Sequence, residues 1–363
     1  MLLSKSIHFR LLWPNRVTMS YKTGLICLKS SLLGLFMLFL QPLCAQYSWN
    51  ELDQELQAKQ KILGNNVVVM LWKGDTLAYK KEMGGFNSKT QAPLAGSSQW
   101  LTIALVMQFV EERKISLDDK IAKWLPEFER YNKNYITIRQ CLSHMTGIGD
   151  KGGFLQRKKF ASLEEEVNAF AAREIRTNAG QDFWYGPIGI NIAGRVLEVV
   201  SKKRFDILIK QKLLTPLEMR RTTFTSPDAS AVNPAAGALT TPDDYMQFLV
   251  MLLNKGKYRG RQLLSEESIR ILLQVQSKPA LVSYAPPAIA GFNYALGGWA
   301  LEEKNGSATA VTHPGFAGTW PFIDYCRNYA YLIFVKNPLD EERIGVYPDL
   351  KKIIDKQVTS TCR

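Results

Sequence analysis

Strand-like sequence stands near both ends of this chain, and helix-like sequence fills the middle. Two β-rich runs surround a glycine-containing turn within residues 67–81, and short runs of strand character return after about residue 290. Helical periodicity dominates between them, at about 97–275. Strands from the two ends pair most simply into one antiparallel sheet, with the helical part as a second lobe.

We therefore predict a mixed α/β (α+β) fold, in which an antiparallel sheet is flanked by helices and joined to an all-helical lobe. The α/β lobe should contain about 46–90 and 285–363, and the helical lobe about 91–284, within one domain of 46–363. A cleft between two such lobes is the default place for a binding site.

Capping signals mark where helices should begin. Thr137 and Gln140 are spaced as a capping box, and Pro242 follows Thr241 at a first helical position. Ser265 should cap a further helix. Other helices are predicted at 49–61, at Trp100–Val110, and at Asp349–Val358 after Pro348. The strand runs of the second half are 294–301, 308–313, 319–324 and 329–336.

The first 45 residues differ in character from the rest. They hold five basic residues and no acidic one, and then the apolar run Leu32–Leu40 before Pro42-Leu43-Cys44-Ala45. A basic start, a short apolar segment and a small terminal residue are typical of a secretory signal peptide. This apolar run is too short to span a membrane, which takes roughly 20 residues.

We therefore expect residues 1–45 to be a signal peptide, cleaved after Ala45, and the mature chain to be secreted or periplasmic without a transmembrane helix. Two alternatives stay open: a lipid anchor on Cys44, and a true start at Met19 instead of Met1. The formal net charge is +13, and it falls to about +8 without the leader. Because no basic run carries interleaved aromatic residues, we expect no nucleic-acid partner.

Few residues of the mature chain suit a metal. Cys141, Cys326 and Cys362 form no CxxC pair, and only His144 and His313 could support them. We predict neither a metal nor a cofactor. A disulfide between Cys326 and Cys362 would suit an oxidising compartment, but the sequence does not determine whether it forms.

Five stretches of the chain, taken in order, match one family. Together these stretches resemble the serine β-lactamase and penicillin-binding-protein superfamily, in its class C and esterase-like branch. The first begins at Trp100-Leu101-Thr102, and four motifs follow it. The stretches are 100–126, 136–147, 183–198, 237–245 and 313–315. The resemblance implies a β-lactamase/transpeptidase-like fold. It also implies an ancestral acyl transfer through a serine ester, on β-lactam, peptide or carboxylic ester substrates.

In that family an SxxK motif opens the first long helix of the helical lobe. The helix N-terminus favours a developing anion, and a lysine one turn later can accept the serine proton. By the match, the serine and the lysine correspond to Gly96 and Gln99 here. Gly96 has no side chain and the amide of Gln99 is not a usable base, so neither half of the nucleophile is present. Ser97 and Ser98 are interpreted as helix caps.

Two further motifs of the family are partly retained. Tyr185 stands at the tyrosine of the YxN motif, which assists proton transfer, whereas Pro187 replaces the asparagine. His313-Pro314-Gly315 matches the K/H-x-G strand motif, so His313, Gly315 and Phe316 are candidate substrate-binding residues. The amides of Gly96 and Phe316 would form the anion hole. His144, in a turn of HTSG type, is interpreted as structural.

Three functions remain in view. The first is a catalytically impaired relative that binds a small ester, amide or peptidoglycan-like ligand, or a partner, in the old cleft. The second is an active hydrolase, esterase or peptidase that uses Tyr185 or Ser97 as a non-standard nucleophile. The third is a structural envelope protein whose cleft is filled by side chains.

Overall fold

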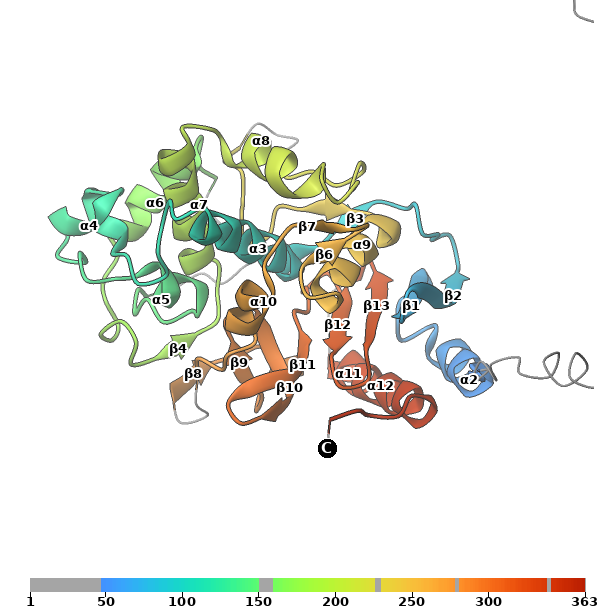
Figure 1. Ribbon diagram of the computed structural model, residues 1–363. Helices are drawn as coiled ribbons and strands as arrows, with labels where there is room; N and C mark the ends of the chain where they lie inside the picture. Colours follow the sequence, from blue (N-terminus) through green and yellow to red (C-terminus); the bar gives the residue numbers. More distant parts are fainter. Residues whose placement is uncertain (1–46, 150–158, 226–229, 278–280, 338–340, 363) are drawn as a thin grey trace, which may run out of the picture. The chain divides into compact units, whose positions relative to one another are not determined.

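A seven-stranded antiparallel sheet joins the two ends of the chain (Figure 1), in the order β2-β1-β13-β12-β11-β10-β9. This computed structural model describes residues 47–149, 159–225, 230–277, 281–337 and 341–362. The predicted signal peptide lies outside the described residues. The strands of the sheet are β1 (Val67–Lys73), β2 (Thr76–Met83), β9 (Asn293–Ala295), β10 (Gly298–Lys304), β11 (Ser307–Thr312), β12 (Trp320–Asp324) and β13 (Tyr329–Val335).

The sheet confirms that strands from both chain ends pair with each other. The N-terminal hairpin turns at Gly74, whose φ of 61° suits glycine. Its first strand, β1, then pairs with β13, and Val67 lies opposite Val335. Every residue of β13 is buried, as expected for an apolar strand covered on both faces.

One strand prediction was wrong. The run 294–301 is not a single strand, because the chain reverses at Leu296-Gly297 and forms β9 and β10 as neighbours. Gly298 has a φ of 148°, a backbone conformation that other residues rarely adopt. The glycine pair thus makes a turn inside what reads as one continuous apolar run.

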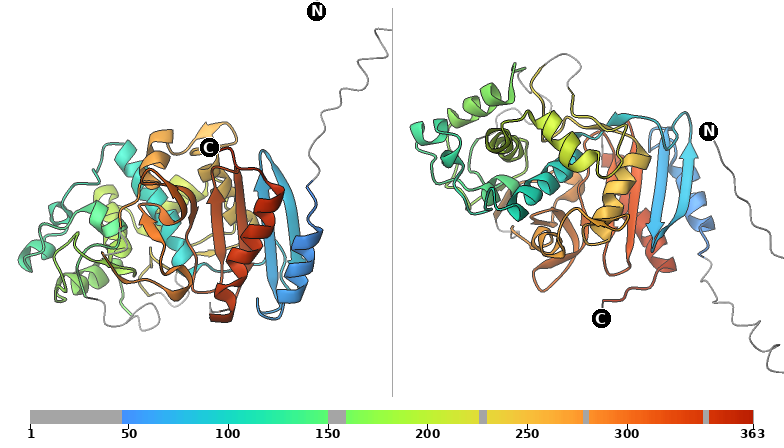
Figure 2. Two further views of the ribbon diagram at one scale, coloured as in Figure 1. Left: turned by 90° about the horizontal axis from the view of Figure 1, so that it is seen from below. Right: turned by 45° about the horizontal axis from the view of Figure 1, so that its top comes forward.

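Helices cover both faces of the sheet. Figure 2 shows α2 (Asn50–Lys59) beside α12 (Val346–Gln357), and these two helices pack against each other. The opposite face is covered by α9 (Pro242–Leu253), which packs against β1, β12 and β13. Helix α12 begins three residues before the predicted first residue Asp349, and a short helix, α11 (Glu341–Ile344), precedes it.

The helical part is built around α3 (Ser98–Glu111). Residues 98–109 of α3 are all buried, which confirms a helix enclosed on most sides. The capping box of Thr137 and Gln140 is present, and Thr241 and Ser265 cap their helices as predicted. The remaining helices are α4 (Glu127–Arg130), α5 (Ile138–Leu142), α6 (Leu163–Ala171), α7 (Ile188–Ser201), α8 (Phe205–Ile209) and α10 (Glu266–Leu272).

Three short strand pairs among the described residues lie outside the seven-stranded sheet. They are β3 (Ala92–Pro93) with β5 (Leu239–Thr240), β4 (Phe183–Trp184) with β8 (Val282–Tyr284), and β6 (Lys257–Tyr258) with β7 (Arg261–Gln262). Near the C-terminus, Cys326 and Cys362 form a disulfide, whereas Cys141 is a buried free thiol. Within the described part of the chain, no helix is both long and apolar enough to cross a membrane.

Candidate active site

Three distant stretches of sequence meet at Gly96. This residue lies in a 3₁₀ turn, Ala95–Ser97, which leads directly into α3. A Cβ atom added to Gly96 would lie 3.0 Å from the Tyr185 hydroxyl oxygen and 3.2 Å from the carbonyl oxygen of Pro314. The structure therefore brings together the positions that the sequence assigned to the nucleophile, the tyrosine motif and the HxG strand motif.

Gly315 allows the strand motif to approach the turn closely. A Cβ atom on Gly315 would lie 2.1 Å from the carbonyl oxygen of Leu94, a distance that no side chain can occupy. Phe316 follows it, half-buried, with its ring 6.2 Å from the Tyr185 ring. The backbone segments that carry the predicted anion-hole amides of Gly96 and Phe316 are thus adjacent.

Gln99 lies one helical turn after Gly96 and has no exposed surface. Neither its amide nitrogen nor its amide oxygen has a hydrogen-bond partner among the described residues. A buried amide without partners carries the full cost of its desolvation, about 1–3 kcal/mol. Tyr185 is buried beside this turn, and its burial raises the pKa of the phenol well above the ordinary value.

Ser97 and Ser98 do not cap α3 with their side chains, so that prediction was wrong. The Ser97 hydroxyl donates to the carbonyl oxygen of His313 at 2.7 Å, and the Ser98 hydroxyl accepts from the Ala238 amide at 3.1 Å. Ser97 has helical backbone angles (φ −63°, ψ −14°), whereas a capping residue needs an extended backbone. The two serines instead hold the turn to neighbouring segments.

Two buried histidines are joined through a tyrosine. The Tyr294 hydroxyl lies 3.2 Å from Nε2 of His144 and 3.3 Å from Nε2 of His313. Desolvation lowers the pKa of each histidine to about 3, so both rings are neutral at ordinary pH. A hydroxyl can donate to one neutral ring and accept from the other, so Tyr294 can satisfy both contacts.

Through Tyr294, this network links the strand motif at His313 to the HTSG-type turn at His144. The ring of His144 also packs 4.6 Å from that of Tyr185, and the structural role of His144 stays a prediction. The ring of His313 is fully buried. Sequence reasoning missed Tyr294, because it lies inside a strand run with no motif around it.

Aromatic rings enclose Tyr185. The Trp299 ring lies 5.6 Å from it, and Trp299 also packs against Phe183 and Tyr294. Beside His144, a cavity of about 20 Å³ is lined by Trp184, Gly186 and other residues, enough room for one water molecule. Trp299 was not predicted either, since a tryptophan in an apolar strand gives no functional signal.

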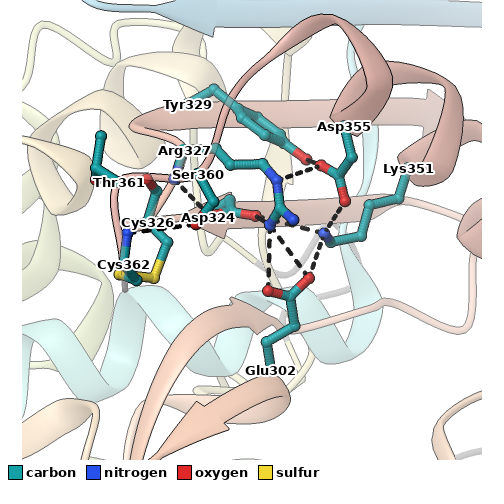
Figure 3. Close-up of polar contacts among 10 residues, drawn as sticks. All are labelled: Glu302, Asp324, Cys326, Arg327, Tyr329, Lys351, Asp355, Ser360, Thr361 and Cys362. Carbon is teal, nitrogen blue, oxygen red and sulfur yellow. Dashed lines mark hydrogen bonds and ion pairs between the residues drawn. A yellow bond between two sulfur atoms is a disulfide. The ribbon is translucent and has the colours of Figure 1, made fainter.

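A group of three carboxylates lies elsewhere, against α12 (Figure 3). Oxygen atoms of Glu302, Asp324 and Asp355 lie within 4.8 Å of one another, close enough to hold a metal ion. Lys351 and Arg327, however, each form ion pairs with all three acids. The chemistry of this group is therefore that of an ion-pair network and does not fit a metal site.

The sheet, the helical part and the Gly96 turn define a protein of the serine β-lactamase and penicillin-binding-protein class. The family model for β-lactamase matches residues 49–347, and the chain belongs to this family. It is similar to the crystal structure of a β-lactamase candidate from Bacteroides dorei, with 25% identity and a TM-score of 0.77. That match covers 85% of this chain and 98% of the other.

Two other matches show how varied the relatives are. A simvastatin synthase mutant from Aspergillus terreus shares the fold at 18% identity, with a TM-score of 0.68 and coverage of 85% of this chain and 96% of that one. Protein flp of Staphylococcus aureus is 25% identical over 153 residues, which is 41% of this chain. The match spans about a third (31%) of the length of that protein.

Proposed function

We propose that this chain is a non-acylating member of the β-lactamase family that binds a small uncharged ligand beside Gln99. The observation that carries the first half is the surroundings of Gly96. A glycine stands at the nucleophile position, and the Tyr185 hydroxyl lies 3.0 Å from the point where a serine would place its Cβ. Acyl transfer needs a nucleophile and a base, and this site supplies neither.

The neighbouring hydroxyls do not replace the missing serine. Ser97 is fully buried, and its proton is donated to the carbonyl oxygen of His313. Tyr185 holds its proton firmly, because burial raises its pKa. A neutral phenol is a poor nucleophile, so these contacts argue against the hydrolase alternative.

The second half of the proposal rests on Gln99. Its amide offers one donor group and one acceptor, both buried and both without a partner in the described part of the chain. Glutamine in place of lysine removes a positive charge, and the neighbouring His313 is neutral. An amide or ester group would complement such a site better than a carboxylate.

A structural role is the second candidate, and one contact favours it. The hydroxyl of Tyr185 occupies the space next to Gly96, as it would in a cleft filled by side chains. In that case the site would bind no ligand, and the protein would act as a structural component of the cell envelope.

We also propose that the mature chain is exported, with cleavage near Ala45. The disulfide between Cys326 and Cys362 supports this, since disulfides persist in oxidising compartments and are rare in the cytosol. N-terminal sequencing of the processed protein should begin at Gln46. A lipid-modified Cys44 would instead favour the anchored alternative.

Two measurements test the main proposal. The purified protein is incubated with a fluorophosphonate and with a fluorescent penicillin, and we expect no covalent label; a label on any serine would overturn the proposal. Thermal unfolding is then followed with acetyl-Ala-Ala-amide and with its carboxylate, acetyl-Ala-Ala. A stabilising shift with the amide alone supports binding at Gln99, and no shift with either compound supports the structural role.

A further inference from the structure

A second cavity lies against α12, and it shares no residue with the Gly96 site. Its volume is about 190 Å³. Strands β10 and β12 form one side and α12 another, with residues that follow β8 closing it. The lining residues are Ala288, Phe292, Leu301, Glu302, Trp320, Phe322, Tyr347, Pro348, Lys351, Lys352 and Asp355.

Aromatic side chains form much of the cavity surface. Trp320 and Tyr347 stack face to face, with ring centroids 4.4 Å apart and planes inclined by 8°. Phe322 and Phe292 add two more rings to the lining, and the Lys351 ammonium already lies over the Phe322 ring, 5.7 Å from its centroid. Aromatic faces attract organic cations as well as apolar groups, and cages of such rings bind ammonium ions in other proteins.

Three members of the ion-pair network drawn in Figure 3, Glu302, Lys351 and Asp355, line the polar side of the cavity. The network contains the three acids Glu302, Asp324 and Asp355 and the two bases Arg327 and Lys351, so these five groups carry one excess negative charge. Lys73 interacts with Asp324, which does not line the cavity, so Lys73 offsets the charge on the side of the network away from the cavity. The pKa of Glu302 is lowered, although its burial alone would raise it, because Lys351 and Arg327 favour the ionised form. Glu302 is thus ionised at neutral pH.

Glu302 is the member of the network best placed to meet a ligand. It lines the cavity, and its side chain is 39% exposed, whereas Asp324 is fully buried. Lys352 also lines the cavity, but it is largely exposed and pairs with Asp349 at 3.0 Å. The excess charge therefore faces the cavity through a carboxylate at its edge.

We infer that this cavity binds a small organic cation: an aromatic ring or compact alkyl group that carries one ammonium. The aromatic rings and the excess carboxylate charge both favour a positive ligand over a neutral or negative one. The volume is suitable, since a cavity of about 150 Å³ in another protein accommodates benzene. Benzylammonium, a single ring with one charged nitrogen, has the required size and chemistry.

Calorimetric titration at pH 7 and about 150 mM salt tests the assignment with three compounds of one shape. They are benzylammonium, benzyl alcohol and benzoate, and the expected order of affinity is cation, alcohol, anion. Equal affinity for the cation and the alcohol would overturn the charge argument. No binding of benzylammonium at ten-millimolar concentration would overturn the site itself.

A matched pair of variants places the binding in the cavity. Glu302→Gln removes the excess charge, and we expect the affinity for benzylammonium to fall about tenfold. Glu303→Gln makes the same chemical change at an exposed neighbour outside the cavity, and should leave the affinity unchanged. An equal loss in both variants, or in neither, would contradict the assignment. None of these results depends on the function of the Gly96 site.

Discussion

The hydroxyl oxygen of Tyr185 lies 3.0 Å from the point where a side chain on Gly96 would place its first carbon. In a site with a serine at this position, the tyrosine would have to leave room for the serine side chain. Here Gly96 has no side chain, and the Tyr185 hydroxyl lies close to the space that a side chain would fill. The absence of a side chain at Gly96 and the position of the Tyr185 hydroxyl therefore belong to one packing arrangement.

Under the proposed function, placing the family's serine and lysine at positions 96 and 99 should produce covalent labelling. The double variant Gly96→Ser/Gln99→Lys supplies a nucleophile and a base one turn apart, and the added Cβ atom at position 96 requires small shifts of the Tyr185 hydroxyl and the Pro314 carbonyl. We expect labelling by fluorescent penicillin about tenfold or more above the parent, measured by gel fluorescence. Each single variant, folded by circular dichroism, should stay unlabelled, because each still lacks one of the two groups. A labelled Gln99→Lys single variant would show that another residue can act as nucleophile.

Replacing the buried amide of Gln99 by an apolar group of similar length should stabilise the protein. In Gln99→Met the two partnerless polar atoms disappear, so the free energy of unfolding should rise by about 1–3 kcal/mol. Urea denaturation measures it. The control is Gln108→Met on the same helix, whose amide nitrogen donates to the carbonyls of Lys212 and Leu263. That change should destabilise, and a loss of stability in both variants would speak against an unpartnered Gln99.

The contact between Gly315 and Leu94 predicts a strong effect of one methyl group. In Gly315→Ala the new carbon would lie 2.1 Å from a backbone oxygen, and the strand end would have to shift. We expect a loss of about 2–4 kcal/mol in the free energy of unfolding. Gly345→Ala is the control, because nothing lies within 4 Å of its new carbon and its φ is −72°. A change of about 1 kcal/mol or less is expected there.

Loss of the Tyr294 hydroxyl alone should destabilise the protein. Tyr294→Phe keeps the packing but leaves ring nitrogens of His144 and His313 without this partner, at a cost of about 1–3 kcal/mol. The same change at Tyr284, which is 40% exposed, should cost less than about 0.5 kcal/mol. Chemical denaturation compares the two, and equal small losses would mean that the buried network contributes little.

The buried histidines also predict how stability depends on pH. Their pKa is about 3 in the folded protein and 6.5 in an unfolded chain, so below pH 6.5 the unfolded state binds more protons. The contribution of the two neutral histidines to the free energy of unfolding is therefore complete above pH 6.5. It falls as the pH drops toward 3, by about 1.4 kcal/mol per pH unit for each histidine. In His144→Asn, which suits the φ of 58° at this position, one histidine no longer titrates. Between pH 6.5 and 5 this variant should lose about 2 kcal/mol less than the parent, as followed by urea midpoints.

The sequence predicted the fold well wherever local signals agreed with the final packing. The hairpin at Gly74, the capping box at Thr137 and the buried helix α3 were all recognisable. The split of 294–301 into two strands was not, because the turn at Gly297 sits inside an uninterrupted apolar run. Such a turn depends on the backbone freedom of glycine and on the neighbouring strand, which periodicity does not report.

The sequence indicated which motif residues form the candidate site, but not the residues that pack around them. Motif spacing placed Gly96, Tyr185 and Gly315, and the structure brings these residues together. The roles of the two serines were missed because their partners, His313 and Ala238, are more than a hundred residues away in the sequence. Tyr294 and Trp299 were missed for the same reason, since burial around a site is set by tertiary packing and carries no local motif.

The pairing of β1 with β13 has a consequence for how the protein is made. Strand β1 is synthesised early, yet its partner, which carries Val335 opposite Val67, emerges only after the helical part and the other five strands of the sheet. Until then the nascent chain holds an incomplete sheet and so lacks its main long-range stabilisation. This delay would keep the polypeptide open and loosely structured during translation, the condition in which a translocation channel can still thread it.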